Sequence, residues 1–330
     1  MALQRLLIAY DGTECASAAL MDLPRAGLPD GLEVRVLTVS EVWVPELTGE
    51  DVATSATSAT HEPDAAAVPS VAASVAASVA GSEAHADSRG MQALHAAQAS
   101  AGTVAAQLQR AHPTWQVRGE ARAQGAAWGI LEVAREWGAN LIVVGSHGRS
   151  TFGRVVLGSV SQKVIAEAPC SVRIARAPWT KGTAAVRVIV GLDGSSDALA
   201  AAEEAASRSW PAGTAVHLVS IVEPRRLRNG VIDESFDPVT SDDPLIVAMR
   251  QQREAARSLF AGRVAVSTDA LRIGEPVAML LEEAEGWGAD AIFLGAKGHG
   301  LLERIVIGSV SASVAARAKC SVEVVRTVAS

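Results

Sequence analysis

Short apolar runs alternate with longer segments in which apolar residues recur every three or four positions. Runs of this length are typical of buried strands, and the longer period is typical of helices packed on a core. We expect strands at residues 6–10, 33–39, 117–123, 141–144, 171–175, 186–192, 215–221, 263–268, 291–294 and 321–325. We expect helices at residues 16–23, 91–110, 129–137, 160–167, 197–209, 245–260, 277–286 and 310–317. The alternation predicts an α/β fold with a parallel sheet and helices on both of its faces.

The same unit occurs twice in the chain. Asp11 ends the first apolar run and is followed by Gly-Thr, and Asp193 ends a similar run and is followed by Gly-Ser, 182 residues later. Further along, residues 138–176 align with residues 288–326 without a gap, at an offset of 150. An internal repeat of this length predicts two copies of one fold. We therefore expect domain 1 at residues 1–178 and domain 2 at residues 185–330.

Domain 1 contains about 32 additional residues, because the two offsets differ by that number. The addition is expected at about residues 53–88, a stretch rich in Ala and Ser in which residues 70–82 repeat Ser-Val-Ala-Ala. Composition alone does not distinguish a weak helix from a mobile loop here. We expect a solvated insertion, and a lid or a partner-binding segment is the alternative. Pro and Gly between strand-like runs predict a linker at residues 175–184.

Each copy carries the glycine pattern G-x2-G-x9-G-S after a buried strand. The first glycine ends the strand, where the missing Cβ lets a ligand approach the backbone. The last Gly-Ser begins a helix, whose unpaired N–H groups and dipole favour an anion. In domain 1 a local alternative is a capping box from Ser159 to Gln162. The repetition of the pattern in a matching context favours a phosphate-binding loop.

With its Asp-Gly-Thr/Ser turns and doubled glycine pattern, the chain resembles the universal stress protein family, in particular its tandem, ATP-binding branch. The closing strands, which follow Cys170 and Cys320, fit this resemblance. It implies two tandem doubly wound parallel five-stranded sheets, Rossmann-like and similar to the adenine-nucleotide alpha hydrolases. The last strands of the two domains would pair and form an internal pseudo-dimer.

The resemblance also implies an ATP site in each domain. The Asp after the first strand would contact the adenosine, the backbone ending the second strand would line the adenine slot, and the glycine loop would hold the triphosphate. Mg²⁺ would bridge phosphate oxygens, since no acidic cluster in the sequence would cage it. The residues implied in domain 1 are Asp11, Val39, Gly145, Gly148, Arg149, Gly158, Ser159 and Val160. Those implied in domain 2 are Asp193, Ile221, Gly295, Gly298, Gly308, Ser309 and Val310.

Several of these residues have local alternatives. Asp-Gly after a strand is ordinary turn chemistry, and Asp11 or Asp193 could cap the following helix. Arg149 would either face a phosphate or lie solvated in its loop. Lys297 replaces His147 in the second copy, which leaves open whether the two sites bind equally.

Composition narrows the function further. A net charge of −7 and an aromatic content of 4% argue against nucleic acid and anionic membranes as partners. Three cysteines are too few for a disulfide framework, and the first apolar run is too short for a signal peptide, so we expect a cytoplasmic protein. Cys170 and Cys320 are expected to be buried.

Catalytic motifs are missing from the sequence. Neither a Walker loop nor the G-x-S-x-G, H-E-x-x-H or C-x-x-C patterns occur, so we expect at most weak ATP hydrolysis. We expect an ATP-binding stress-response regulator or sensor that forms a homodimer of tandem chains and acts on an unidentified protein partner. The alternatives are a nucleotide-free scaffold of the same fold and a slow ATPase. An adenylate-transferring enzyme would need a different loop after the first strand.

Overall fold

The computed structural model describes residues 3–41, 71–146, 157–176, 185–227, 237–238, 240–268, 271–297 and 307–327. The strands are β1 (Arg5–Ala9), β2 (Glu33–Ser40), β3 (Gln116–Ala123), β4 (Leu141–Gly145), β5 (Ser171–Ala175), β6 (Arg187–Leu192), β7 (Ala215–Val222), β8 (Ala265–Thr268), β9 (Arg272–Ile273), β10 (Ala291–Gly295) and β11 (Ser321–Val325). The helices are α1 (Glu14–Asp22), α2 (Val71–Ala111), α3 (Ala126–Trp137), α4 (Ser159–Glu167), α5 (Ser196–Ser207), α6 (Pro244–Leu259), α7 (Pro276–Trp287) and α8 (Ser309–Arg317), with 3₁₀ turns η1 (Leu23–Arg25) and η2 (Pro224–Arg226). Every expected strand and helix is present, and apart from α2 the bounds differ by three residues at most. The short β9 was not expected.

The strands form one sheet in the order β3-β2-β1-β4-β5-β11-β10-β6-β7-β8, and β9 pairs with the end of β7. Every pair within each half is parallel, whereas β5 and β11 pair antiparallel and join the halves. The predicted α/β fold with a mostly parallel sheet is therefore confirmed. Pairing of the two last strands, which the family resemblance implied, is also found. It covers two edges that would otherwise expose unpaired backbone groups.

Helices cover both faces of this sheet because neighbouring strand residues point to opposite sides. Leu6 and Leu7 are both fully buried, but Leu6 packs with α1 and α2, whereas Leu7 packs with α3 and α4. In domain 2, α5 and α6 cover the first of these faces, and α7 and α8 cover the other. The cluster beneath α3, α4, α7 and α8 is continuous across both domains. The two copies thus share one core on that face.

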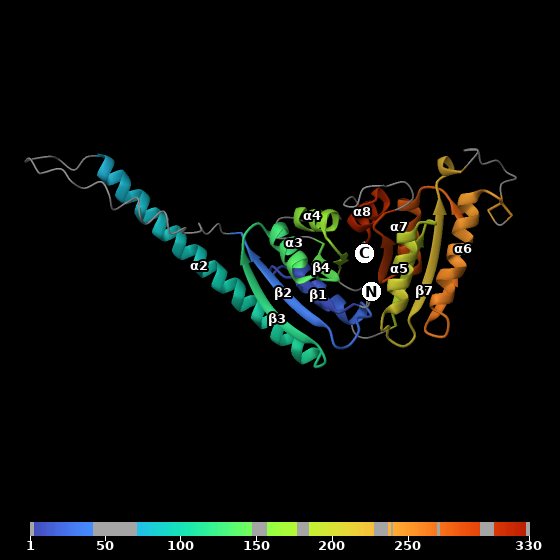
Figure 1. Cartoon of the computed structure of the whole chain (residues 1–330), viewed down its shortest axis with the longest axis horizontal. Helices are drawn as coiled ribbons and strands as arrows, with labels where there is room; N and C mark the ends of the chain where they lie inside the picture. The colour runs from blue at the N-terminus through green and yellow to red at the C-terminus, as the bar shows by residue number, and fades with distance from the viewer. Residues whose placement is uncertain are drawn as a thin grey trace, which may run out of the picture.

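The helix α2 is much longer than the sequence suggested. It begins at Val71, so residues 71–82 of the Ala/Ser repeat are helical rather than a loop. The helix runs out from the body of the protein at its N-terminal end (Figure 1). Its other end lies on the sheet, where Ala97, Ala101, Val104 and Leu108 are buried at helical spacing. The rest of the expected insertion, residues 53–70, and the linker residues 177–184 lie outside the described residues.

A buried ionic network crosses the boundary between the domains. The Arg173 guanidinium is fully buried and donates to the two carboxylate oxygens of Asp22 at 2.6 and 3.1 Å, and to Glu323 at 3.3 Å. Glu323, also fully buried, accepts a further hydrogen bond from Arg208. Each buried charge therefore has an opposite charge within hydrogen-bond distance, which burial of an ionised group requires.

Candidate functional site

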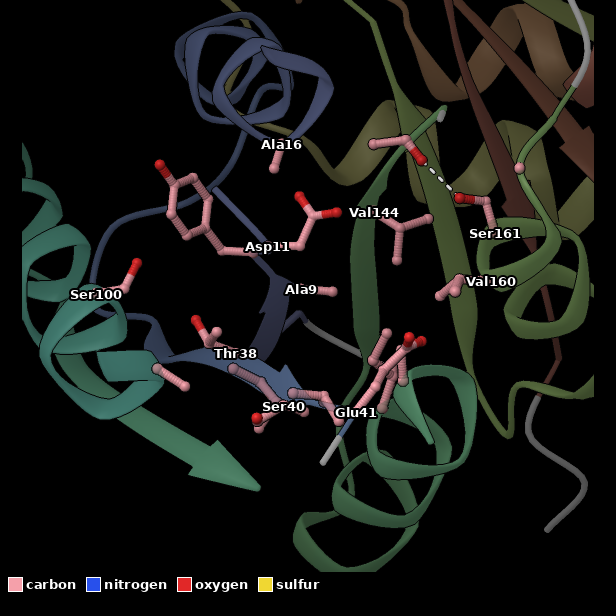
Figure 2. A pocket seen from close by; sticks show the side chains of 18 of the residues that line it. Ala9, Asp11, Ala16, Thr38, Ser40, Glu41, Ser100, Val144, Val160 and Ser161 are labelled. Carbon is pink, nitrogen blue, oxygen red and sulfur yellow. Dashed lines mark hydrogen bonds between the residues drawn. The ribbon is translucent and has the colours of Figure 1, made fainter. Parts of the chain in front are cut away.

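A cavity of about 940 Å³ lies in domain 1 beyond the carboxyl ends of β1, β2 and β4 (Figure 2). The strand order reverses between β1 and β4, which is where open α/β sheets bind ligands. The α2 and α3 helices and the first turn of α4 complete the walls. The lining residues are Ala9, Tyr10, Asp11, Ala16, Leu37, Thr38, Val39, Ser40, Glu41, Ala93, Ala96, Ala97, Ser100, Ala126, Ile130, Val144, Gly145, Leu157, Gly158, Ser159, Val160 and Ser161.

Six of the predicted domain 1 residues meet in this cavity. They come from parts of the chain up to 149 residues apart, and the sheet brings them to one edge. The two others, Gly148 and Arg149, lie outside the described residues. The six that meet are Asp11, Val39, Gly145, Gly158, Ser159 and Val160.

The turn after β1 holds the Asp11 carboxylate in place. One carboxylate oxygen accepts from the Thr13 backbone N–H at 3.0 Å and from the Thr13 hydroxyl at 2.6 Å. The Thr13 oxygen in turn accepts from the Ala16 N–H at 3.2 Å and caps α1. Gly12 makes this turn possible with φ +78°. The helix cap is therefore Thr13, and Asp11 is oriented by it at the cavity wall.

The α4 helix presents an N-terminus without a side-chain cap to the cavity. Its N-cap is Gly158, at φ −64° and ψ 154°, which has no side chain, and among the described residues no side-chain cap is found. The alternative capping box would need Ser159 as the N-cap, whereas Gly158 holds that position, and the Gln162 amide donates to the Leu157 carbonyl at 2.9 Å. The N–H groups at such a helix N-terminus and the positive end of the helix dipole attract an anion.

The glycine at the end of β4 is also required for helix packing. A Cβ added to Gly145 would lie 2.9 Å from the backbone carbon and oxygen of Cys15, so the glycine makes room for α1. The same holds in domain 2, where a Cβ on Gly295 would lie 2.5 Å from the Asp197 backbone. Close packing of a helix against the strand explains these two glycines, and both still lie at the carboxyl edge of the sheet.

Sequence reasoning missed Thr38. Its side chain lines the cavity, the residue is 8% exposed, and its hydroxyl has no hydrogen-bond partner among the described residues. A buried hydroxyl without a partner is costly unless a ligand or water satisfies it. The repeat contained a signal, because the matching residue of domain 2, Ser220, also carries a hydroxyl, and this hydroxyl is likewise buried without a partner among the described residues. Ser100 of α2 was missed as well, since α2 could not be placed over the sheet from sequence.

The predicted residues of domain 2 occupy the matching positions. Asp193 follows β6, Ile221 lies near the end of β7, Gly295 ends β10, and Gly308 is the N-cap of α8. Ser309 and Val310 form the first turn of α8, and Gly298 lies outside the described residues.

Neither a metal-binding cluster nor a membrane-spanning helix is found among the described residues. Within them, no three His, Cys, Asp or Glu side chains come together as a metal site would require. No helix in the described part of the chain combines the length and the hydropathy needed to cross a bilayer.

The profile of the universal stress protein family matches residues 2–176 and 186–326. The chain belongs to the universal stress protein family. It contains two such domains in tandem. A universal stress protein of Mycolicibacterium smegmatis is 28% identical over 220 residues, which cover 64% of this chain and 69% of that protein. One of Mycobacterium tuberculosis is 30% identical over 204 residues, which cover 60% of this chain and 64% of that protein.

The fold agrees with this assignment. The crystal structure of a universal stress protein from Archaeoglobus fulgidus superimposes with a TM-score of 0.59 at 20% sequence identity. The match covers 98% of both chains. At this identity the likeness concerns the fold alone, and it extends over both domains.

Proposed function

We propose that this universal stress protein binds ATP in the domain 1 cavity and acts as a nucleotide-dependent regulator or sensor in the stress response. The observation that supports the proposal is that six predicted residues line one cavity, five of them from two separate motifs and the sixth, Val39, from near the end of the second strand. The cavity also has the size and mixed polarity of a small-molecule site.

The two ends of the cavity suit the two ends of the nucleotide. At the α4 end, the N–H groups of the first turn would receive phosphate oxygens, with Ser159 as an additional hydroxyl donor. At the opposite end, the Asp11 carboxylate would accept from ribose hydroxyls, and Leu37, Val39 and Ile130 supply apolar surface for the adenine. Mg²⁺ would bridge phosphate oxygens, where the phosphates themselves provide ligands.

An acidic protein can bind an anion in this way. The net charge of −7 disfavours binding through a general positive field. Backbone N–H groups at a helix N-terminus provide a local positive potential that is independent of the net charge.

The α2 helix provides a physical link from ligand to partner. Ala93, Ala96, Ala97 and Ser100 line the cavity, and the same helix continues outward to Val71. Occupancy of the cavity would stabilise the packed end of α2 and so restrict the projecting end. We propose that an unidentified protein partner responds to this change and that two tandem chains associate as a homodimer.

The test is a binding measurement with a structurally mild variant. Mg·ATP at 100 times its Kd should stabilise the protein by about 2.7 kcal/mol, seen as a rise in Tm. Gly158→Asp should abolish the rise, because the new carboxylate would cap α4 and take the place of a phosphate. Asp is a favoured N-cap residue, so this variant should fold. Absence of both a Tm rise and co-purified nucleotide in the wild type would leave a nucleotide-free scaffold as the function.

A further inference from the structure

The edge of the domain 2 sheet that corresponds to the domain 1 cavity carries a cluster of large apolar side chains. Val222, Leu227, Ile246, Met249 and Leu271 form a separate buried cluster. Val222 ends β7 and corresponds to Ser40, which lines the domain 1 cavity. The cluster therefore lies at the carboxyl edge of the domain 2 sheet.

The helices that cover this edge differ in residue size. Glu33 pairs with Gln116 in domain 1, and the corresponding Ala215 pairs with Ala265, so β3 and β8 are offset by 149 residues. Extended along the sequence to the preceding helix, this offset aligns three of the four cavity-lining residues of α2 with three large apolar residues of α6. Ala96, Ala97 and Ser100 correspond in this way to Leu245, Ile246 and Met249. Small side chains leave space in domain 1, and large ones occupy it in domain 2.

A glutamine also engages the turn after β6. The buried Gln252 of α6 accepts from the Gly194 N–H at 2.8 Å and donates to the Ser195 carbonyl at 2.5 Å. These hydrogen bonds tie α6 to the Asp-Gly-Ser turn, whose domain 1 counterpart lines the cavity through Asp11.

A carboxylate occupies the glycine-loop end of the same edge. Asp197, in the first turn of α5, accepts from the Lys297 backbone N–H at 3.1 Å and from the Thr327 hydroxyl at 3.3 Å. Lys297 lies in the glycine loop that would receive phosphate by resemblance. The residue of domain 1 that corresponds to Asp197 is Cys15, which brings no negative charge. The internal carboxylate would thus repel a phosphate and compete for a loop N–H group.

We infer that the chain binds one nucleotide, in domain 1, and that domain 2 keeps its corresponding site closed with its own side chains. The inference rests on the proposed function of the domain 1 cavity. Apolar packing closes the base end of the domain 2 site, and Asp197 closes the phosphate end. Domain 2 then keeps the same structure whether or not nucleotide is bound, and the ligand-dependent change takes place in domain 1.

The matched variants Gly158→Asp and Gly308→Asp test this by equilibrium dialysis against Mg·ATP. Both glycines are helix N-caps with nearly the same backbone angles, so Asp should be tolerated equally. We expect one nucleotide per chain, an affinity loss of about 100-fold or more in Gly158→Asp, and a change below about threefold in Gly308→Asp. Two nucleotides per chain, or loss in Gly308→Asp alone, would overturn the inference and leave the proposed function standing. No binding to the wild type would overturn the proposed function itself, and the inference with it.

Three further variants keep the test independent of the N-cap substitutions. The hydroxyls of Thr38 and Ser220 are both buried and without a hydrogen-bond partner among the described residues, so they form a matched pair. Thr38→Val should weaken binding about tenfold, whereas Ser220→Ala should leave it unchanged because domain 2 holds no nucleotide. The triple variant Asp197→Cys, Ile246→Ala and Met249→Ser gives domain 2 the residues of domain 1. It should bind a second nucleotide, and a stoichiometry that stays at one would contradict closure by these side chains.

Discussion

Arg173 and Glu323 occupy the same position of the two repeats, 150 residues apart, and they pair with each other across the domain boundary. In the antiparallel register of β5 and β11, Val172 pairs with Val324 and Ile174 pairs with Val322. The local two-fold axis therefore passes between Arg173 and Glu323. A residue on such an axis meets its own counterpart, so two identical domains would place like charges together. The Arg–Glu pair favours contact between domain 1 and domain 2 over contact of either domain with its own copy.

Removing one of these charges should destabilise the protein strongly. Glu323→Leu would leave Arg173 and Arg208 buried near each other, and we expect a loss of about 3–5 kcal/mol in the free energy of unfolding. The double variant Arg173→Met/Glu323→Leu should lose less than the sum of the losses in Arg173→Met and in Glu323→Leu. Urea unfolding of the four proteins measures this coupling.

The surface pair Lys319–Glu285 provides a control for that cycle. Both side chains are 49% exposed and lie 2.8 Å apart. Glu285→Ala should change the unfolding free energy by less than about 1 kcal/mol. Strictly additive effects of the Arg173 and Glu323 substitutions would show that the buried pair is not coupled.

Two arginines at the domain boundary cap helices of the opposite domain. Arg176 donates to the Ala315 and Cys320 carbonyls near the end of α8, at 2.6 and 3.2 Å. Its repeat counterpart Arg326 donates to the Ile165 and Ala166 carbonyls of α4, at 2.8 and 3.0 Å. The exchange of caps ties each domain to the other through the helix C-termini, where a cation is favoured.

We expect Arg176→Lys to cost about 1.5–3 kcal/mol, because an ammonium group cannot reproduce the planar two-carbonyl contact. Thermal unfolding of the full chain measures the loss. Arg317→Met, at an exposed position in the last turn of α8, should cost less than about 1 kcal/mol. Equal losses of stability in Arg176→Lys and Arg317→Met would mean that Arg176 stabilises the protein through the helix dipole rather than through its contact between the domains.

Gly119 of β3 sets how closely α2 approaches the sheet. A Cβ at this position would lie 2.6 Å from the backbone of Ala101 and Gly102. Gly119→Ala should therefore push α2 outward, cost about 1–3 kcal/mol, and weaken Mg·ATP binding by distorting the α2 wall of the cavity. Chemical unfolding and equilibrium dialysis measure the two effects.

Gly102→Ala is the matched control for this substitution. Gly102 lies inside α2, and a Cβ there would meet nothing within 4 Å. Alanine should stabilise the helix by about 0.5–1 kcal/mol. If Gly119→Ala were as stable as the wild type, the close approach of α2 would have no energetic consequence.

Alkaline pH should destabilise the protein through two buried thiols. Burial raises the pKa of Cys170 and of Cys320 to about 12, and the nearby Arg326 and Arg176 offset only part of this. The unfolded chain releases these protons near pH 8.5, whereas the folded chain retains them up to about pH 12. Stability is therefore unaffected below about pH 8 and falls as the pH rises above it, by up to about 1.4 kcal/mol per thiol and pH unit.

The double variant Cys170→Ala/Cys320→Ala should lose less stability than the wild type between pH 8 and pH 10, as measured by urea unfolding. Alkylation gives a second measurement. At pH 8 the half-buried Cys15 should react with iodoacetamide well before Cys170 and Cys320. Equal labelling of the three thiols, or identical pH profiles of the two proteins, would contradict the assignment.

The pattern of apolar residues along the sequence was sufficient to place nearly every strand and helix. Short buried runs and helical periods depend on residues that are close in the sequence, so they can be recognised without knowing the tertiary contacts. The repeat added the domain organisation, since Asp11 and Asp193 recur in the same context together with the glycine loops. From these motifs, the carboxyl edge of each sheet could be predicted as the place where the candidate site residues gather.

Other features depended on contacts between residues far apart in the chain. The burial of the Thr38 hydroxyl without a partner among the described residues depends on the packing around β2, and Asp197 reaches a backbone N–H that is 100 residues away. Likewise, the composition of the Ala/Ser repeat did not distinguish a helix from a loop. The position of α2 is set by its packing on β3, which exists only in the folded protein. The repeat therefore predicted a site in each domain and left open whether the two bind equally. The difference in side-chain packing at the two sheet edges depends on contacts in the folded protein, which local sequence does not encode.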